Sequence, residues 1–197
     1  MLAALTLDAR GQEPSFLPGA KWGLVPPQGF TMRLDTVARF QHPSGAVIAI
    51  VDAPKPFAPE DLGAIGSIQG SGRDLSRLDE VEDVELGGRT AVLVRMRMIQ
   101  READYLSLLI EGEQSVGILT FAIPDKASGA VDRAEIRASL MTAVERVMKP
   151  EDRLAEFPIK LADLADMRIA TVLMGSFLML TDGPSDDMES GADQPFV

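Results

Sequence analysis

The stretch Thr90-Ala-Val-Leu-Val-Arg-Met-Arg-Met-Ile99 decides the fold, because its side chains alternate along a run of strand length. Alternation places Ala91, Leu93, Arg95 and Arg97 on one face and a row of valines and methionines on the other. One face can therefore pack inward while the other carries the arginines. Three more strand candidates surround this one, separated by tight polar or glycine turns: Asp79–Leu86, Tyr105–Glu111 and Val116–Ile123. The series predicts an antiparallel meander.

The segments on either side of the meander complete the predicted fold. Strand-like runs precede it at Lys21–Val25, Phe30–Leu34, Val37–Gln41 and Ala46–Val51. Pro59 and the acids that follow it predict a short helix through Leu62–Ile65. After the meander, apolar residues at three-to-four-residue spacing predict a long amphipathic helix over Asp125–Met148, which Pro150 ends. The fold class is α+β, an antiparallel β-sheet meander flanked by helices.

The C-terminal part repeats a pattern from the N-terminal part. Met32–Val37 and Gly45–Pro54 are matched by Met167–Val172 and Gly175–Pro184, and each pair reads as two strands of a hairpin. We therefore expect residues 20–149 to form one domain and 150–156 to form a polar linker. Residues 157–197 are then either a β-hairpin extension or a truncated second repeat, with an acidic tail. Because an isolated hairpin is marginally stable in water, this one should pack on the first domain or join copies of the chain in a homo-oligomer.

Composition narrows the classes of function. The chain has 197 residues, a formal net charge of −11, no cysteine and a single histidine, His42. A strongly acidic chain without a cluster of basic residues is unsuited to nucleic acid. The absence of cysteine excludes thiol nucleophiles and thiolate metal sites, and one histidine cannot build a multi-histidine zinc site. A carboxylate-only Mg²⁺ or Ca²⁺ site stays open, but no pattern indicates a cofactor or a catalytic residue.

The first nineteen residues are interpreted as an N-terminal tail or the remnant of a secretory signal. A short apolar run, Met1–Leu7, is followed by small residues at Ala9 and Gly11, as at the end of a signal peptide. The basic start and most of the apolar core of such a signal are missing. A periplasmic or secreted location is the expectation, with a cytoplasmic one as the alternative. No apolar run approaches the roughly 20 residues of a membrane-spanning helix.

Four segments share the strand and turn patterns of a known superfamily: Val25-Pro-Pro-Gln-Gly-Phe30, Pro43-Ser-Gly-Ala-Val-Ile-Ala-Ile50, Val84-Glu-Leu-Gly-Gly-Arg-Thr-Ala91 and Ile118-Leu-Thr-Phe-Ala-Ile-Pro124. Over about residues 20–149 the chain resembles the Mog1/PsbP-like superfamily. This resemblance implies an αβα sandwich around an antiparallel sheet. Members act mostly as binding or assembly proteins, among them photosystem subunits, a Ran GTPase partner and bacterial envelope proteins. The resemblance supplies no active-site residue.

Four residues are candidates for binding a partner: Trp22, Tyr105, Arg95 and Arg97. The first two are the only tryptophan and the only tyrosine, residue types that are enriched in binding hot spots and also common at the edges of cores. The acids of the first meander strand, Glu80, Glu82, Asp83 and Glu85, have two interpretations. They either form paired carboxylates for cation binding or glycoside chemistry, or solvate the outer face of the strand.

The sequence thus favours a non-catalytic bacterial binding or assembly module, exported from the cytoplasm, which engages an unidentified protein partner through its sheet face or edge strands. The alternative is a small-ligand or divalent-cation-binding domain, with or without hydrolytic activity carried by carboxylates.

Overall fold

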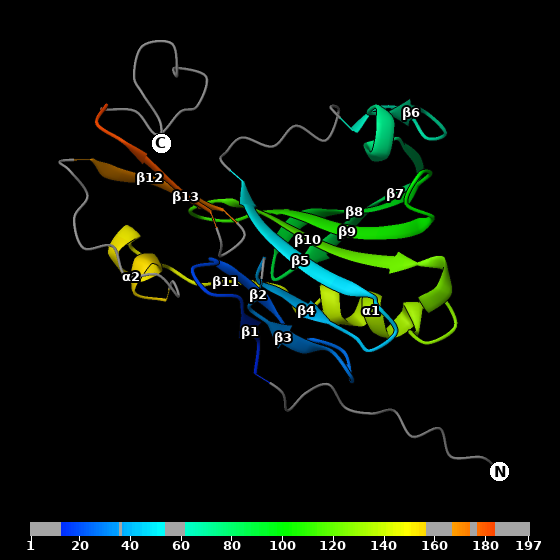
Figure 1. Ribbon diagram of the computed structural model, residues 1–197, viewed down its shortest axis with the longest axis horizontal. Helices are drawn as coiled ribbons and strands as arrows, with labels where there is room; N and C mark the ends of the chain where they lie inside the picture. Colours follow the sequence, from blue (N-terminus) through cyan, green and yellow to red (C-terminus); the bar gives the residue numbers. More distant parts are fainter. Residues whose placement is uncertain (1–12, 36, 54–61, 157–166, 174–176, 184–197) are drawn as a thin grey trace.

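A computed structural model describes residues 13–35, 37–53, 62–156, 167–173 and 177–183. Its centre is an eight-stranded antiparallel sheet with strand order β3-β4-β5-β10-β9-β8-β7-β6 (Figure 1). The strands are β3 (Thr31–Arg33), β4 (Arg39–Gln41), β5 (Val47–Ala53), β6 (Ile68–Gln69), β7 (Ser76–Leu86), β8 (Arg89–Met98), β9 (Ala103–Glu111) and β10 (Val116–Pro124). The predicted meander is confirmed as β7 to β10, each pairing with the next.

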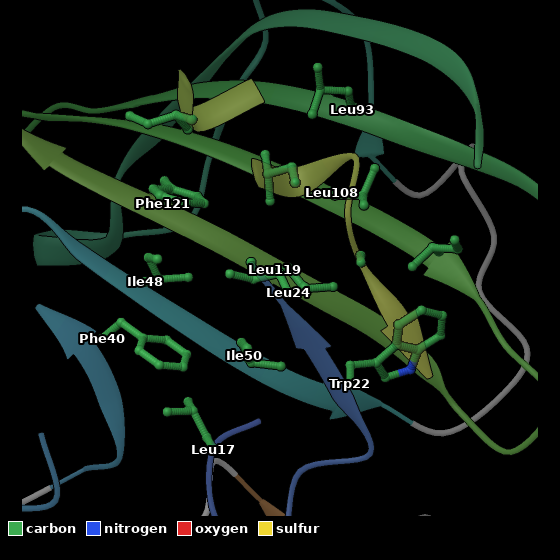
Figure 2. Packing of buried hydrophobic residues seen from close by; sticks show 14 of the residues in the cluster. Leu17, Trp22, Leu24, Phe40, Ile48, Ile50, Leu93, Leu108, Leu119 and Phe121 are labelled. Carbon is green, nitrogen blue, oxygen red and sulfur yellow. The ribbon is translucent and has the colours of Figure 1, made fainter. Parts of the chain in front are cut away.

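One face of this sheet is covered by a small sheet and a helix. The small sheet has the order β1-β2-β11 and consists of β1 (Ser15–Phe16), β2 (Trp22–Leu24) and β11 (Val144–Glu145). The helix, α1 (Arg133–Leu140), lies on the same face (Figure 1). Their apolar side chains meet those of β5 and β10 in the main core, where Trp22, Leu24, Ile50 and Leu119 lie close together (Figure 2).

The long helix predicted over Asp125–Met148 is wrong in extent. Residues Asp125–Ala127 form one turn of 3-10 helix, and α1 begins only after Asp132, whose carboxylate accepts a hydrogen bond of 2.8 Å from the Ala134 amide. Beyond Met141 the chain extends and pairs with β2 as β11. Pairing with another strand therefore overrides the helical spacing at Val144 and Val147, which are 39% and 73% exposed.

The other face of the sheet carries a second, smaller apolar cluster. Leu62 contacts a second apolar cluster formed by Leu78, Val92, Val94 and Leu109. The helix predicted at Leu62–Ile65 is not α-helical, and the residues expected to start it lie outside the described part of the chain. Within the described residues this segment contributes a 3-10 residue at Leu62, the short strand β6 and a 3-10 turn, Gly72–Asp74. The antiparallel sheet is thus confirmed, whereas a sandwich with helices on both faces is not.

The C-terminal part forms a helix and a hairpin. Helix α2 (Pro150–Ala155) occupies the segment predicted to be a polar linker. Strands β12 (Arg168–Leu173) and β13 (Phe177–Thr181) pair antiparallel, which confirms the predicted hairpin. Strand β12 contacts both α2 and β5. The predicted strand at 157–161 and the acidic tail lie outside the described residues, and the second repeat and the homo-oligomer stay predictions.

Among the described residues, no helix combines the length and the apolar character needed to cross a membrane.

Candidate binding cleft

A cleft of about 350 Å³ lies on the α1 face of the meander. Its floor is apolar and comes from three neighbouring strands, through Leu93 of β8, Leu106 of β9 and Ile123 of β10. Its walls are charged and come from β7, β8, β9 and α1. The remaining lining residues are Glu80, Glu82, Arg95, Asp104, Tyr105, Arg133 and Arg137. The cleft therefore combines an apolar surface with a rim of both charge signs.

One ion pair joins the α1 wall of the cleft to the β7 wall. The guanidinium of Arg137 on α1 donates two hydrogen bonds, of 2.6 and 2.7 Å, to the two carboxylate oxygens of Glu82 on β7. Both side chains are 43% exposed, so solvent screens the pair. The hydrogen bond from Arg137 lowers the pKa of the Glu82 carboxyl. This bidentate contact links α1 to β7 across the cleft.

A bulge in β7 brings two consecutive acids to the cleft side of the sheet. The pairing of β7 with β8 shifts between Leu78 and Glu80, so that Asp79 is the extra residue. Glu80 then pairs with Arg95 at 3.2 Å, and Asp79 lies 3.7 Å from the same arginine. Asp79 also accepts a hydrogen bond of 2.5 Å from Arg77, and this bond lowers the pKa of the Asp79 carboxyl.

The ion pairs continue along one end of the cleft. Arg97 donates to Asp125 at 2.5 and 2.7 Å and to Asp104 at 3.2 Å. Asp104 in turn pairs with Arg133 of α1. The hydrogen bond from Arg97 lowers the pKa of the Asp125 carboxyl. Within the described part of the chain, the carboxylates in and beside the cleft are therefore held by arginines.

The structure brings two of the four predicted partner-binding residues together. Arg95 and Arg97 lie on the α1 face, opposite Leu106 and Asp104 of β9. Tyr105 pairs opposite Met96, so its side chain is on the other face, where its hydroxyl lies 3.5 Å from an Arg101 nitrogen. It therefore lines the cleft without pointing its ring into it. Partner binding by these residues stays a prediction.

Trp22, the fourth candidate, is a core residue at the opposite end of the same sheet face. Its side chain is 1% exposed, and its indole nitrogen donates a hydrogen bond of 3.1 Å to the Ser115 hydroxyl. The indole ring packs directly on the backbone of β10 at Gly117. A Cβ added to Gly117 would stand only 2.5 Å from the ring, so glycine is what allows this close approach. Trp22 therefore offers no exposed surface, and the sequence alone gave no signal that distinguished this role.

A buried ion pair lies beside Trp22. The carboxylate of Asp52 at the end of β5 accepts hydrogen bonds from the main-chain amides of Lys21 at 2.9 Å and Trp22 at 3.4 Å. It also accepts one of 2.8 Å from Arg153 of α2, and the two side chains are only 5% and 9% exposed. Burial raises the pKa of the Asp52 carboxyl and lowers that of the Arg153 guanidinium. This pair ties α2 to the sheet.

The sequence reasoning missed Arg133, Arg137, Asp52 and Arg153. The first two stand four residues apart on one side of α1, a spacing that could have indicated a shared surface. Asp52 ends an apolar strand, which is a weak sign of a buried charge. Nothing in the sequence indicated Arg153, because its partner lies 101 residues away.

Two further observations bear on ligands. The described residues contain no group of three or more histidines, aspartates or glutamates arranged to hold a metal ion.

A second recess of about 370 Å³ lies between the β7–β8 turn and β11. Its one carboxylate, Glu145, already accepts hydrogen bonds from the main-chain amides of Glu113, Gln114 and Ser115, at 2.5, 3.0 and 3.1 Å.

The chain was also compared with known proteins. No protein-family model matches the sequence, and neither does any curated protein. The solution structure of cyanobacterial PsbP (CyanoP) from Synechocystis is 12% identical, with a TM-score of 0.44, over 64% of this chain and 87% of that one. A crystal structure from Bacteroides thetaiotaomicron is 12% identical, with a TM-score of 0.36, over 68% of this chain and 48% of that one. The PsbP-like resemblance predicted from the sequence is thus found again, as a weak resemblance in fold that says nothing about activity.

Proposed function

We propose that the protein is a non-catalytic binding module that engages a protein partner at the cleft between α1 and the meander. The observation that carries this proposal is the composition of the cleft, an apolar floor of Leu93, Leu106 and Ile123 inside a rim of ion pairs. Protein interfaces share this plan of an apolar centre and a polar rim. Arginine is also enriched at interfaces, and three of the lining residues are arginines.

The state of the carboxylates supports binding rather than proton transfer. Glu80 and Glu82 each hold an arginine, and the pKa of Glu82 is lowered by its bond to Arg137. A carboxylate with a lowered pKa is a weak general base and is not available as a general acid near neutral pH. A partner can replace one member of such an exposed ion pair with a charged side chain of its own. The free energy lost by breaking the original pair is small, because solvent already screens the pair.

Site-specific cross-linking tests this proposal. A photo-cross-linking amino acid in place of Arg133, at the rim of the cleft, should form a covalent adduct with one protein when cells of the source organism are irradiated. The same amino acid in place of Arg73, which is exposed but outside the cleft, is the control. A partner captured from position 133 and not from position 73 is the expected result. No adduct from position 133, or the same proteins from both positions, would contradict the proposal.

A small-ligand site is the second candidate function, and the volume of the cleft favours it. About 350 Å³ lies at the lower end of the range of ligand pockets. A thermal-shift screen with sugars, nucleotides, Ca²⁺ and Mg²⁺ distinguishes the two functions. A ligand that stabilises the protein, and that no longer does so after Arg137→Met, would favour the second candidate over the first.

We also propose that the protein is exported to the periplasm or secreted. The support is the apolar run at Met1–Leu7 followed by Ala9 and Gly11. Fusion of the complete gene to a reporter enzyme that is active only outside the cytoplasm is the test. An inactive fusion that accumulates in the cytoplasm would exclude export.

A further inference from the structure

We propose that the partner is held through a basic extended segment, which adds to the sheet as a strand along the outer edge of β7 from Asp79 to Leu86. This inference rests on the proposed function, because β7 forms one wall of the cleft through Glu80 and Glu82. It names the chemistry of the partner and the main-chain surface that binds it.

The outer edge of β7 is open over most of its length. Strand β6 pairs only with Ser76 and Arg77, and main-chain hydrogen bonds to Gly66 and Ser67 use the amide and carbonyl of Leu78. From Asp79 onward, no described strand pairs with this edge, although β8 pairs with the inner edge as far as Leu86. As far as the described residues show, the outward main-chain groups of this stretch have no strand partner, and such groups can pair with a strand from another molecule.

The side chains along this edge set the charge of the partner. Asp79–Leu86 holds five acids and no basic residue. Glu80 and Glu82 lie on the cleft face, opposite Arg95 and Leu93, whereas Asp83 and Glu85 lie on the other face, opposite Val92 and Thr90. A strand added here would meet acids on both faces. Lysine or arginine at the matching positions complements them, and acidic residues there would be repelled.

The same acidic side chains disfavour a second copy of this chain as the strand added to the β7 edge. A second copy of the chain would place its own acidic β7 against this one, and like charges in adjacent strands are destabilising. The opposite edge of the sheet is β3, which spans only Thr31–Arg33 and carries a basic residue. The β7 edge is therefore the longer of the two edges. Its acidic side chains also favour a basic strand over an acidic one.

Two peptides of equal charge test the inference on the full chain. The first has the core Lys-Val-Lys-Lys-Val-Lys, which matches the acid-and-valine pattern of Glu80–Glu85 in either direction. In the second, both valines are replaced by proline, which keeps the charge but cannot add to a sheet. Binding is measured by titration calorimetry, and amide hydrogen exchange of β7 is followed by NMR. We expect the valine peptide to bind roughly tenfold more tightly and to slow exchange in Asp79–Leu86.

Matched charge reversals complete the test. Asp83→Lys with Glu85→Lys should abolish binding of the valine peptide, since both side chains are exposed on this edge. Glu13→Lys with Asp152→Lys changes the net charge equally at exposed positions elsewhere and should leave binding within about twofold. Equal binding of both peptides, or equal weakening by both pairs of substitutions, would show attraction by net charge alone and overturn the inference.

The outcomes separate this inference from the proposed function. If a partner is captured from position 133 and that complex is unaffected by the reversals at Asp83 and Glu85, the inference is wrong and the function stands. If no partner is captured from position 133, the proposed function is wrong regardless of the peptides.

Discussion

The two halves of one sheet face use the same kinds of side chain for different purposes. In the half beneath β1, β2 and β11, Trp22 lies flat on Gly117 and the ion pair between Asp52 and Arg153 is buried. In the half beneath α1, the ion pair between Glu82 and Arg137 is 43% exposed on each side and borders a cleft. Solvent exposure, rather than residue type, therefore distinguishes the ion pair that lies in the core from the ion pair that borders the cleft.

The largest effect is expected from breaking the buried pair. Asp52→Ala removes the acceptor of two main-chain amides and leaves Arg153 without this carboxylate, which should lower the free energy of unfolding by about 3–5 kcal/mol. Urea denaturation measures the loss. Asp52→Asn is the control, because it keeps an oxygen acceptor and resembles the neutral carboxyl that burial favours. It should cost less than half as much. An equal loss in both variants would mean that the charge matters more than the acceptor.

A smaller effect is expected from the contact between β10 and Trp22. In Gly117→Ala the added Cβ would lie 2.5 Å from the buried indole, so the ring or the strand must shift. Overpacking of this kind should cost about 1–3 kcal/mol, measured as a lower free energy of unfolding. Gly129→Ala is the matched control, since its Cβ would meet nothing within 4 Å. Equal stability of the two variants would contradict the close packing of this half.

The smallest effect, and the one that compares the two ion pairs directly, is their dependence on pH. Because the folded pKa of Asp52 is raised, the advantage of the wild type over Asp52→Asn should fall as the pH rises above the ordinary value of 3.8. Because the folded pKa of Glu82 is lowered, its contribution is present above the ordinary value of 4.5 and is lost as the pH falls through the lowered one.

Stability curves from about pH 3 to about pH 7 for the wild type, Asp52→Asn and Glu82→Gln test these signs. The two difference curves should slope in opposite directions. Slopes of the same sign would show that the two carboxylates occupy similar environments, and the comparison would fail.

The sequence predicted the sheet better than it predicted the site, for physical reasons. Alternation along Thr90–Ile99 reports directly which side chains share a face, so Arg95 and Arg97 were placed correctly together. The prediction that the arginine face is the outward one is wrong for half of the strand, because Ala91 and Leu93 on that face belong to the main core. The extent of α1 was misjudged, because the spacing at Val144 and Val147 satisfied a helix while pairing with β2 decided the structure. The cleft depends on contacts such as Glu82 with Arg137, which lie 55 residues apart and leave no local pattern.

The central claim is that the partner binds at β7 and the α1 cleft, while the half that contains Trp22 and Asp52 serves the fold. Amide hydrogen exchange across the whole chain, with and without the partner captured from position 133, tests this claim most directly. We expect slower exchange along Asp79–Leu86 and in α1, with β2 and α2 unchanged. Protection confined to β2, α2 and the C-terminal hairpin would contradict it.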